Sequence, residues 1–529
     1  MFSFPHAIPH PMNSTPPLAF DAAPVTPLDA ANQTLLSHVS PQDWQNPTPA
    51  GCYDLVVIGA GTAGLVVAAG AAGLDLGLKV ALIERHLMGG DCLNVGCIPS
   101  KCLIRSGRVA ADMRQSLPFG VQPPAEVAVD FGSVMARMRQ LRAGISHHDS
   151  AQRFQGLGVD VFLGGGQFLQ PGQIQVGSQV LAYKKAVIAT GARAVRPNIP
   201  GLDQAGYLTN ETVFNLTEAP RRLAVIGGGP IGCELAQVFQ RLGSQVVLFH
   251  RGNHVLHKED ADAAALVQGA LVRDGVELVL QCQLQQVEVT PEGKRLTYSS
   301  GENTGTIVVD EILAGAGRAP NVEGLNLEAV GVQYDRRRGV VVNDYLQTSN
   351  PQIYAAGDIC MDWKFTHAAD AAARIVLKNT LFSPWGLGRA RLSDLVMPWA
   401  TYTDPEVAQV GLSEQDARHQ GIAVDTIYID MAKVDRAIAD GETEGFVKIH
   451  HKRGSDQILG ATIVARHGGD MISEITTAMV HNLGLSKLSS VIHPYPTQAE
   501  AIKKAADAYR RTLLTPKTKK FLKLLTRFS

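Results

Sequence analysis

Cys92 and Cys97 are the residues whose type and spacing point most directly to chemistry. Four residues separate them in the string GGDCLNVGCIPSK, residues 89–101, which leads into a helix expected to begin near Pro99. The thiolate is the reactive form of cysteine, and a helix N-terminus lowers the pKa of a thiol. Because structural disulfides are rare in a reducing compartment, a disulfide between them there would be a redox couple that opens and closes. The spacing alone is a weak signal, and it becomes strong in combination with the dinucleotide motifs described next.

Two glycine-rich strings indicate sites for dinucleotides. YDLVVIGAGTAG and RRLAVIGGGPIGCELA each place three glycines between an apolar strand and a helix. Glycines let the backbone approach a pyrophosphate, and the helix N-terminus offers free N–H groups and a positive dipole end. The glycines are Gly59, Gly61 and Gly64 in the first string and Gly227, Gly229 and Gly232 in the second. The two strings predict two nucleotide-binding units.

The residue that ends the next strand differs between the two units. In the first unit it is Glu84, and an acid there binds a ribose. In the second it is His250, followed by Arg251, with His257 and Lys258 a few residues later. An acid would repel a 2′-phosphate, whereas a guanidinium forms charge-assisted hydrogen bonds with it. The second unit is therefore expected to bind NADPH rather than NADH; the alternative is that these basic residues belong to an ordinary surface.

At these strings the chain resembles the class I, FAD-dependent pyridine nucleotide-disulfide oxidoreductases. Within that family it is more similar to mercuric reductase-like members than to dihydrolipoamide dehydrogenase or glutathione reductase. Four further segments match motifs of the family, so that the resemblance extends from about residue 51 to 510. They are AVIATGARAVRP (186–197), GAGRAPN (315–321), TSNPQIYAAGDIC (348–360) and MPWATYTDPEVAQVGLSE (397–414).

The resemblance implies that electrons pass from NADPH through FAD to a Cys92–Cys97 disulfide. Cys97 is then the thiolate against the flavin, and Cys92 is the thiol that meets the substrate. Lys101 and Glu234 match the family's ion pair near the redox edge of the flavin, with a purely structural salt bridge as the alternative. The flavin supplies the redox chemistry, and the protein positions and tunes it.

Other residues are expected near the flavin by their place in the family's motifs. Asp358 would hydrogen-bond the ribityl chain, and Gly191 and Gly317 lie in the ATG and GAGRAPN segments. Asp91 departs from the family, in which threonine is usual at this position. A carboxylate there raises the pKa of Cys92 if it faces the thiol.

The segment VIHPYPTQAEA, residues 491–501, bears on the electron acceptor. In relatives that reduce disulfides, a histidine and a glutamate five residues later complete the active site of the other subunit, which implies a homodimer. Here Tyr495 takes the place of that histidine, and Glu500 matches the glutamate. Tyrosine, with a pKa of about 10, is a poor proton donor to a departing thiolate. The substitution favours a metal ion or a small oxidant as acceptor.

Rival functions stay open. His493, two residues before Tyr495, is the alternative proton donor, and its use together with NADH would make the chain a dihydrolipoamide dehydrogenase. Transfer from the flavin directly to a quinone is a second alternative, and a non-catalytic redox sensor docked on a membrane is a third. No cysteine precedes Cys52 or follows Cys360, so thiolates for passing a soft metal ion inward are absent from both flanks.

The composition limits the class of protein. The chain has 529 residues, 45% of them apolar, and its 48 Lys and Arg nearly balance 49 Asp and Glu, which argues against nucleic acid as a partner. Seven cysteines are too few for a disulfide scaffold and cannot all pair, which favours a reducing compartment, for which the cytoplasm is expected. Cys52, Cys233, Cys282 and Cys360 show no metal-ligand spacing, and no metal site is expected. Cys102 is expected to be an inert thiol.

Leu55–Leu74 carries no charge, but its glycines divide it into a strand and a helix rather than a membrane span.

The two glycine strings predict an α/β fold with two Rossmann-like dinucleotide-binding domains. The resemblance implies that these bind FAD and NADPH and that a C-terminal α+β dimerisation domain follows. The FAD domain is expected in two parts, 51–197 and 323–391, with the NADPH domain at 198–322 and the dimerisation domain at 392–510. A disordered Pro-rich leader is expected over residues 1–50. Residues 511–529 are expected to form a basic amphipathic tail that packs on its own domain or contacts an anionic membrane.

Overall fold

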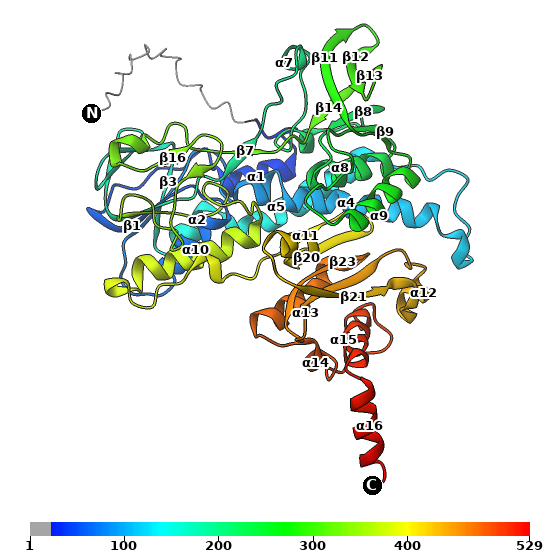
Figure 1. Ribbon diagram of the computed structural model, residues 1–529. Coiled ribbons are helices and arrows are strands. Elements are labelled where there is room, and N and C mark those ends of the chain that lie inside the picture. Colours follow the sequence, from blue (N-terminus) through cyan, green and yellow to red (C-terminus); the bar gives the residue numbers. More distant parts are fainter. Residues whose placement is uncertain (1–22, 529) are drawn as a thin grey trace, which may run out of the picture.

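A mostly parallel sheet builds the first dinucleotide unit. The computed structural model describes residues 23–528 and is shown in Figure 1. The strands of this sheet are β1 Cys52–Ile58, β2 Val80–Glu84, β3 Val159–Leu163, β4 Gly166–Gln170, β5 Gln173–Val176, β6 Gln179–Ile188 and β18 Ile353–Ala355. Their order is β3-β2-β1-β6-β5-β4, and β18 pairs in parallel with β6. The sheet is therefore completed by a strand that follows the second unit in the sequence.

The second dinucleotide unit has a smaller parallel sheet. Its strands are β8 Arg222–Ile226, β9 Gln245–Phe249, β10 Glu277–Val279 and β14 Glu311–Ala314, in the order β10-β9-β8-β14. An antiparallel sheet follows β10 in the chain and consists of β11 Cys282–Thr290, β12 Gly293–Ser300 and β13 Asn303–Val309. The short strands β7 Ala192–Ala194 and β15 Arg318–Pro320 pair with each other and tie the entry and exit of this unit together.

The last large sheet is antiparallel. Its strands are β19 Pro398–Thr401, β20 Glu406–Gly411, β21 Val424–Asp430, β22 Phe446–Lys452 and β23 Ile458–Ala465, in the order β19-β20-β23-β22-β21. A two-stranded ribbon, β16 Tyr334–Asp335 and β17 Gly339–Val340, precedes it in the chain. Two parallel sheets with helices and one antiparallel sheet with helices confirm the predicted α/β class.

Helices cover the sheets and carry the residues of the predicted site. They are α2 Thr62–Ala72, α3 Gly90–Asn94, α4 Cys97–Arg114, α5 Phe131–Ser146, α6 Ala151–Gly156, α7 Leu202–Ala205, α8 Pro230–Arg241, α9 Ala261–Arg273, α10 Thr366–Leu381, α11 Glu414–His419, α12 Asp435–Asp440, α13 Gly468–Val480, α14 Leu485–Leu488 and α15 Glu500–Thr512. α4 packs against α5 and α8, and α2 packs against α10. Among the described helices, none is long and apolar enough to cross a membrane.

The disordered leader expected over residues 1–50 is wrong for part of that range. Residues Ala30–Val39 form helix α1, which Asp29 caps by accepting a hydrogen bond from a backbone N–H of the first turn. Leu35 and Val39 are fully buried against the first dinucleotide unit. The proline-rich composition of the segment conceals ten consecutive residues without proline, AANQTLLSHV. The first 22 residues, where the rest of that expectation falls, lie outside the described part of the chain.

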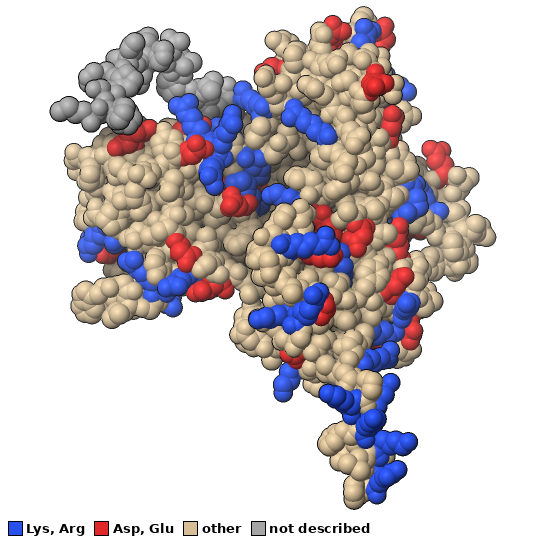
Figure 2. Space-filling view, in the orientation of Figure 1, with Lys and Arg blue, Asp and Glu red and all other residues tan. Residues whose placement is uncertain are grey.

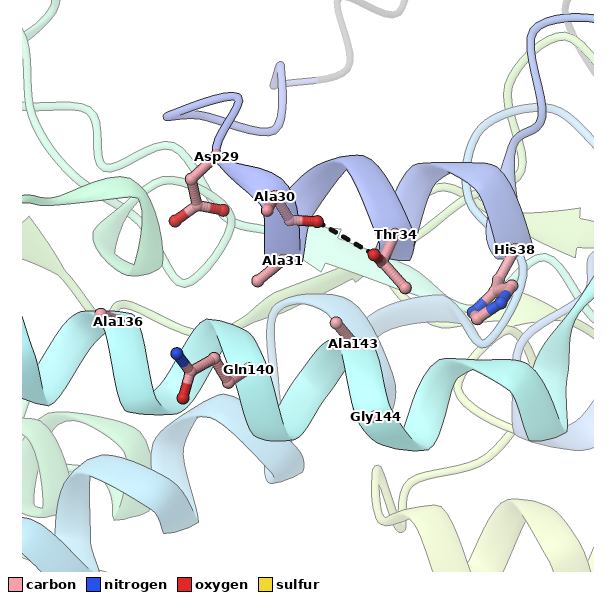
Figure 3. A pocket seen from close by; sticks show the side chains of 9 residues that line it. All are labelled: Asp29, Ala30, Ala31, Thr34, His38, Ala136, Gln140, Ala143 and Gly144. Atoms are coloured by element: carbon pink, nitrogen blue, oxygen red, sulfur yellow. Dashed lines mark hydrogen bonds between the residues drawn. The ribbon is translucent and has the colours of Figure 1, made fainter.

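Helix α1 lies along α5 and supports the loop of the cysteine pair. Arg142 of α5, which is 2% exposed, donates to the side chain of Asn32 at 2.7 Å and to the carbonyl of Asn94, the last residue of α3, at 2.6 Å. Figure 3 shows a hollow between the two helices, lined mainly by alanines, glycine and short polar side chains. The small residues allow the helices to approach, and the buried arginine links α1 to the helix that contains Cys92.

The basic tail does not pack on its own domain. Pro516–Leu525 form helix α16, which begins with Thr515 as N-cap and proline at its first position. None of its residues is buried. In Figure 1 the helix, drawn in red, extends away from the body of the molecule. Of the two alternatives for this tail, packing on its own domain is therefore wrong.

The packing of α1 yields a stability prediction. Leu35→Ala should lower the free energy of unfolding by about 2–5 kcal/mol, because it empties apolar volume in a closed core. The midpoint of urea unfolding of the FAD-loaded protein, followed by circular dichroism, measures this. Leu28→Ala is the matched control, since Leu28 is 62% exposed, and should change the free energy by less than about 0.5 kcal/mol. Equal midpoints for the two variants would contradict the burial of α1.

Candidate active site

Cys92 and Cys97 meet at the junction of two helices. Cys92 lies in α3 and Cys97 is the first residue of α4, with Gly96 between them as N-cap. A Cβ at Gly96 would lie 2.7 Å from the carbonyl oxygen of Asp91, so the turn that joins the helices needs glycine there. The Cys92 thiol hydrogen-bonds the Cys97 sulfur, and the Cys97 sulfur lies 3.3 Å from Oγ1 of Thr366, the first residue of α10.

The surroundings give the two thiols different acidities. The hydrogen bond from Cys92 lowers the pKa of Cys97 to about 6, with further help from Thr366 and from the charge of Lys101, and against the effect of burial. The same hydrogen bond and burial raise the pKa of Cys92. The reduced pair therefore holds its proton on Cys92 and its negative charge on Cys97 near neutral pH.

Lys101 and Glu234 form an ion pair that joins the two dinucleotide units. Lys101 lies one helical turn after Cys97 on α4, and its Nζ is 2.9 Å from Oε2 of Glu234 on α8. The other carboxylate oxygen of Glu234 accepts the backbone N–H of Tyr402 at 2.9 Å. The Lys101 ammonium lies 4.4 Å from the centre of the Tyr402 ring. Burial alone would lower the pKa of Lys101, but Glu234 outweighs it and raises that pKa.

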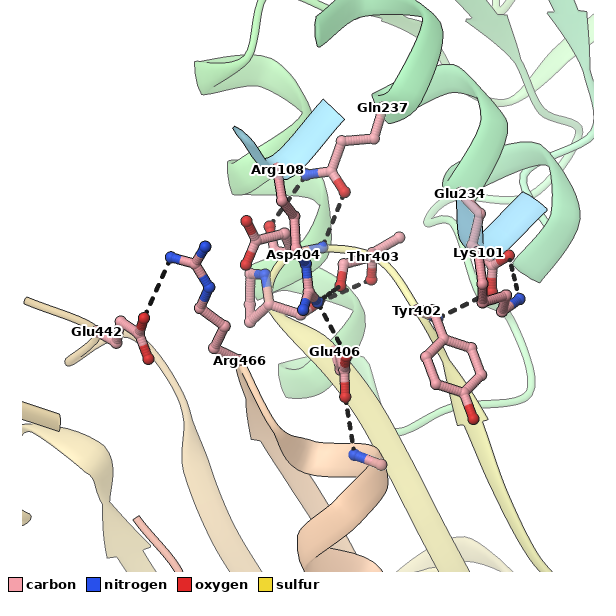
Figure 4. Close-up of polar contacts among 12 residues, drawn as sticks. Lys101, Arg108, Glu234, Gln237, Tyr402, Thr403, Asp404, Glu406, Glu442 and Arg466 are labelled. Atoms are coloured by element: carbon pink, nitrogen blue, oxygen red, sulfur yellow. Dashed lines mark hydrogen bonds and ion pairs between the residues drawn. The ribbon is translucent and has the colours of Figure 1, made fainter. Parts of the chain in front are cut away.

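A second polar cluster, beside this ion pair in Figure 4, ties α4 and α8 to the antiparallel sheet. Arg108 of α4 donates to the carboxylate of Glu406 at 2.9 Å and to the carbonyl of Thr403 at 3.2 Å. Gln237 of α8 exchanges hydrogen bonds with the backbone of Asp404 at 3.0 Å and 2.8 Å. The cysteine pair is thus placed by three parts of the chain that are far apart in sequence.

The first glycine loop has the shape that the predicted FAD requires. A Cβ at Gly64 would lie 1.8 Å from the carbonyl oxygen of Gly59, so the loop closes only without a side chain there. Gly61 is the N-cap of α2, where the nearest atom to an added Cβ is 3.7 Å away. Glu84 ends β2, and its carboxylate accepts the N–H of Ala60 at 2.7 Å. An uncovered helix N-terminus beside an anchored loop fits the pyrophosphate of FAD.

The second glycine loop repeats this geometry with a different anchor. A Cβ at Gly232 would lie 1.8 Å from the carbonyl oxygen of Gly227, while one at Gly229 would meet nothing within 4 Å. The N–H of Gly228 donates to Nδ1 of His250 at 3.2 Å, where the first loop uses Glu84. Burial lowers the pKa of His250, so the anchor is neutral near pH 7. The loop fits a dinucleotide without placing a negative charge at its edge.

Arg251 and His257 flank this loop as exposed side chains. The ring of His257 stacks on that of His250 with their centres 6.3 Å apart. Within the described residues, no hydrogen bond or ion pair holds the Arg251 guanidinium. Arg251 is therefore available to a phosphate.

Arg318 is a site residue that the sequence reasoning missed. Its guanidinium donates to the carboxylate of Asp91 and, at 2.6 Å, to the carbonyl of Ala192, and it lies 3.5 Å from the carboxylate of Asp358. Burial raises the pKa of Asp358, and Arg318 opposes that effect. Asp91, the residue that departs from the family pattern, thus faces Arg318. The GAGRAPN string contained the signal, because it places an arginine directly after Gly317.

Thr366 and Tyr402 were also missed. Thr366 lies in no sequence motif that would identify it as a site residue, and only the packing of α10 brings it to Cys97. Tyr402 lies in the MPWATYTDPEVAQVGLSE segment, where its contact with Lys101 has no local signature. Gly191 and Gly317 flank the β7–β15 pairing, where Gly191 accepts the N–H of Asn321 at 3.0 Å.

Tyr495, Glu500 and His493 lie together at the start of α15 and in the loop before it. The Tyr495 hydroxyl donates to Asp435 at 3.0 Å. His493 is bound to both carboxylate oxygens of Glu474 at 3.0 Å. Within the described chain, none of the three makes a hydrogen bond or ion pair with the cysteine pair. The part of the chain that the structure describes also contains no group of three or more His, Cys, Asp or Glu arranged to hold a metal ion.

The acidity of Cys97 is directly testable. In the reduced protein, ultraviolet thiolate absorbance should rise with a midpoint at about pH 6, because Cys97 loses its proton there and the thiolate disappears again below that pH. Cys97→Ser should remove this titration, and Lys101→Met should move it to higher pH, since a stabilising positive charge is lost. A wild-type titration only near the ordinary thiol value of about 8.5 would contradict the assigned environment.

Comparison with known families supports the same assignment. The pyridine nucleotide-disulphide oxidoreductase profile matches residues 53–373, and the profile of the family's dimerisation domain matches residues 397–506. The mercuric reductase of Staphylococcus aureus is 34% identical over 456 residues, which cover 86% of this chain and 82% of the relative. The dihydrolipoyl dehydrogenase of Thermus scotoductus is 33% identical over 472 residues, covering 87% and 98%.

A solved structure extends the comparison to the fold. The Cu(II) complex of the HOCl-induced flavoprotein disulfide reductase RclA from Escherichia coli is 26% identical to this chain, with a TM-score of 0.75, and the match covers 87% of this chain and 99% of that one. The matching family depends on FAD and uses pyridine nucleotides, and its dimerisation domain supports a homodimer. The predicted family is confirmed: this chain belongs to the pyridine nucleotide-disulphide oxidoreductases.

Proposed function

We propose that this protein is an NADPH-dependent, FAD-containing reductase whose Cys92–Cys97 pair delivers electrons to a metal ion or another small oxidant. The side chain at position 495 carries the proposal. Tyr495 is 71% exposed, and its hydrogen bond to Asp435 raises its pKa above the ordinary value. A phenol held in this way is a poor acid, whereas reduction of a disulfide substrate needs an acid for the departing thiolate. A metal ion needs none.

The cysteine pair is the electron donor of the proposed reaction. FAD, when bound, relays electron pairs between a nicotinamide and such a pair. The chain holds the reduced pair ready, because Cys92 keeps the proton and Cys97 keeps its negative charge near Lys101. When the pair reacts, the sulfur–sulfur bond forms, the proton of Cys92 leaves and two electrons pass to the acceptor. These two electrons convert one Hg²⁺ to the neutral metal, or two Cu²⁺ to two Cu⁺.

The names of the relatives support an acceptor of this kind. The S. aureus relative is a mercuric reductase, and the E. coli structure is a Cu(II) complex. Soft thiolates suit such ions.

The seven cysteines of the described chain are free, which suits a reducing compartment such as the cytoplasm.

The proposed active site is shared between two subunits. The segment around Tyr495 and Glu500 presents exposed apolar side chains, with Val491 42% and Ile492 91% exposed. Apolar side chains gathered in this way mark an interface. Tyr495 and Glu500 are therefore assigned to the cysteine pair of the other subunit in the homodimer.

NADPH is the proposed nucleotide because of the charge around the second loop. The neutral His250 replaces an acid that would repel a 2′-phosphate, and Arg251 and His257 are exposed beside it. A guanidinium binds phosphate through charge-assisted hydrogen bonds. The three residues together favour a phosphorylated ribose.

Arg251→Glu tests the choice of nucleotide. The variant should lower kcat/KM for NADPH about 10- to 100-fold, the value of a charge-assisted hydrogen bond, and leave NADH turnover unchanged. Steady-state rates with both nucleotides measure this. Arg295→Glu, an equal charge change at an exposed position of β12, is the control and should affect neither. Equal wild-type efficiency with both nucleotides, with no effect of Arg251→Glu, would rule out the assignment.

Dihydrolipoamide dehydrogenase is the second candidate, favoured by one observation. His493 and Glu474 form a histidine–carboxylate pair at 3.0 Å, an arrangement suited to proton transfer. The His493 side chain is only 6% exposed in a single chain, which places the pair inside its own domain. Turnover of lipoamide with NAD that depends on His493 would reverse the order of the two candidates.

An acceptor panel separates the remaining routes. With NADPH, Hg²⁺ and Cu²⁺ should be reduced faster than lipoamide, oxidised glutathione or a quinone. Cys92→Ser should abolish metal turnover, about a 100-fold loss or more, because the exchange thiol is gone. Cys102→Ser, five residues after Cys97 on the same helix, is the control and should retain full activity. If quinone turnover is the fastest and survives in Cys92→Ser, the flavin rather than the pair is the donor; absence of all turnover would favour a sensor.

A further inference from the structure

Helix α16 and the turn after it, residues 516–528, form a surface that the proposed reaction does not use. Its large apolar side chains are open to solvent: Phe521 is 58% exposed, Leu522 43%, Leu524 49% and Phe528 83%. No residue of the helix is buried. Exposed phenylalanines and leucines gathered in one short segment indicate a site of interaction.

The cations of the segment gather on the other side of the helix. Lys519 and Lys523 are four residues apart and share a face, with Lys520 beside them, whereas Phe521 and Leu524 are three apart and share another. No acidic residue occurs from Ala508 to the end of the sequence. Figure 2 shows the blue cationic side chains along this projection, with no red among them in the face in view. The segment is amphipathic, with one side mainly basic and the other mainly apolar; Lys517, four residues before Phe521, lies on the apolar side at the start of the helix.

These cations are not neutralised within the described chain. None of the lysines of α16 takes part in an ion pair there. Like charges four residues apart on a helix repel and destabilise it. Lys519 and Lys523 are such a pair, so an anionic surface that covers them would stabilise the helix. The unneutralised lysines therefore favour an anionic partner. The exposed phenylalanines and leucines favour a partner that can also bury apolar side chains.

A phospholipid leaflet meets both requirements at once. Its anionic headgroups attract lysine, and its acyl boundary takes up apolar side chains of a helix lying in the plane. At ten residues, α16 is about 15 Å long, too short to cross a bilayer. A second copy that met this helix with its own α16 would bring the same cations against these, which favours the membrane over that self-association.

Attachment at this helix would hold the whole molecule. Helix α15 leads into α16 through residues 513–515, and its inner face is part of the core of the antiparallel sheet, with Ile502 fully buried and Tyr509 7% exposed. We infer that residues 516–528 anchor this protein to the surface of membranes rich in anionic phospholipid, with the Phe521 side in the leaflet and the Lys519 side toward the headgroups.

Cosedimentation of the FAD-loaded, full-length protein with vesicles tests the inference. Vesicles of equal parts phosphatidylcholine and phosphatidylglycerol should bind it, vesicles of phosphatidylcholine alone should not, and salt should weaken binding. The double variant Lys519→Glu and Lys523→Glu should reduce partition about 25-fold or more, since each cation contributes about fivefold. Phe521→Ser should reduce it about tenfold.

Matched controls lie elsewhere on the surface. Arg337→Glu with Arg338→Glu repeats the charge change at exposed arginines between β16 and β17, and Trp385→Ser removes a side chain that is 94% exposed; both should bind like the wild type. Equal cosedimentation with and without residues 515–529 would overturn the inference. So would a loss of the dimer in lipid-free light scattering when those residues are removed, because the segment would then serve the second copy.

Discussion

The Lys101–Glu234 ion pair is the contact on which the rest of the arrangement depends. Glu234 is buried between the two dinucleotide units, and a carboxylate there is tolerated only with a cation and hydrogen-bond donors around it. Lys101 comes from α4, the second partner is the backbone of Tyr402, and Glu234 itself comes from α8. One buried charge therefore fixes three parts of the chain relative to one another. Because α4 begins at Cys97, the same contact fixes where the redox pair stands.

The two dinucleotide-binding loops could be predicted because their close backbone contacts require glycine at fixed positions in the sequence. Gly64 and Gly232 are required by carbonyl oxygens only 1.8 Å from where a Cβ would be, and such loops recur with the same spacing. Helix α1 was missed because the prolines on both sides of it obscured its short apolar pattern, and its contact with Arg142, over a hundred residues away, has no local signal. Thr366 reaches Cys97 from α10, a helix 269 residues further along the chain that packs against α2. Short sequence motifs reflect the steric requirements of a single loop or helix. Contacts such as those of Arg142 and Thr366, made between segments far apart in the chain, have no such motif.

The two dinucleotide loops share one backbone geometry but differ in the charge of the residue that anchors them. Each loop is anchored by a side chain at the end of the following strand, through a backbone N–H of the loop. In the first loop the acceptor is a carboxylate, and in the second it is a neutral imidazole. The hydrogen bond is kept while the charge at the edge of the site changes. At Asp91 the opposite change occurs: a carboxylate stands close to the cysteine pair, and the guanidinium of Arg318 pairs with it.

The pairing of β18 with β6 has a consequence for biosynthesis. The first sheet places Ile353–Ala355 beside the end of β6 at Ile188, so the ribosome must make the whole second unit before the first sheet is complete. At bacterial and eukaryotic elongation rates of about 5–20 residues per second, that interval lasts on the order of 10–30 seconds. During it, the nascent chain carries a parallel sheet with an unpaired inner edge, the kind of edge that joins other strands. The order of translation thus leaves the first sheet open until β18 is made, and the antiparallel sheet of residues 398–465 is made only after that.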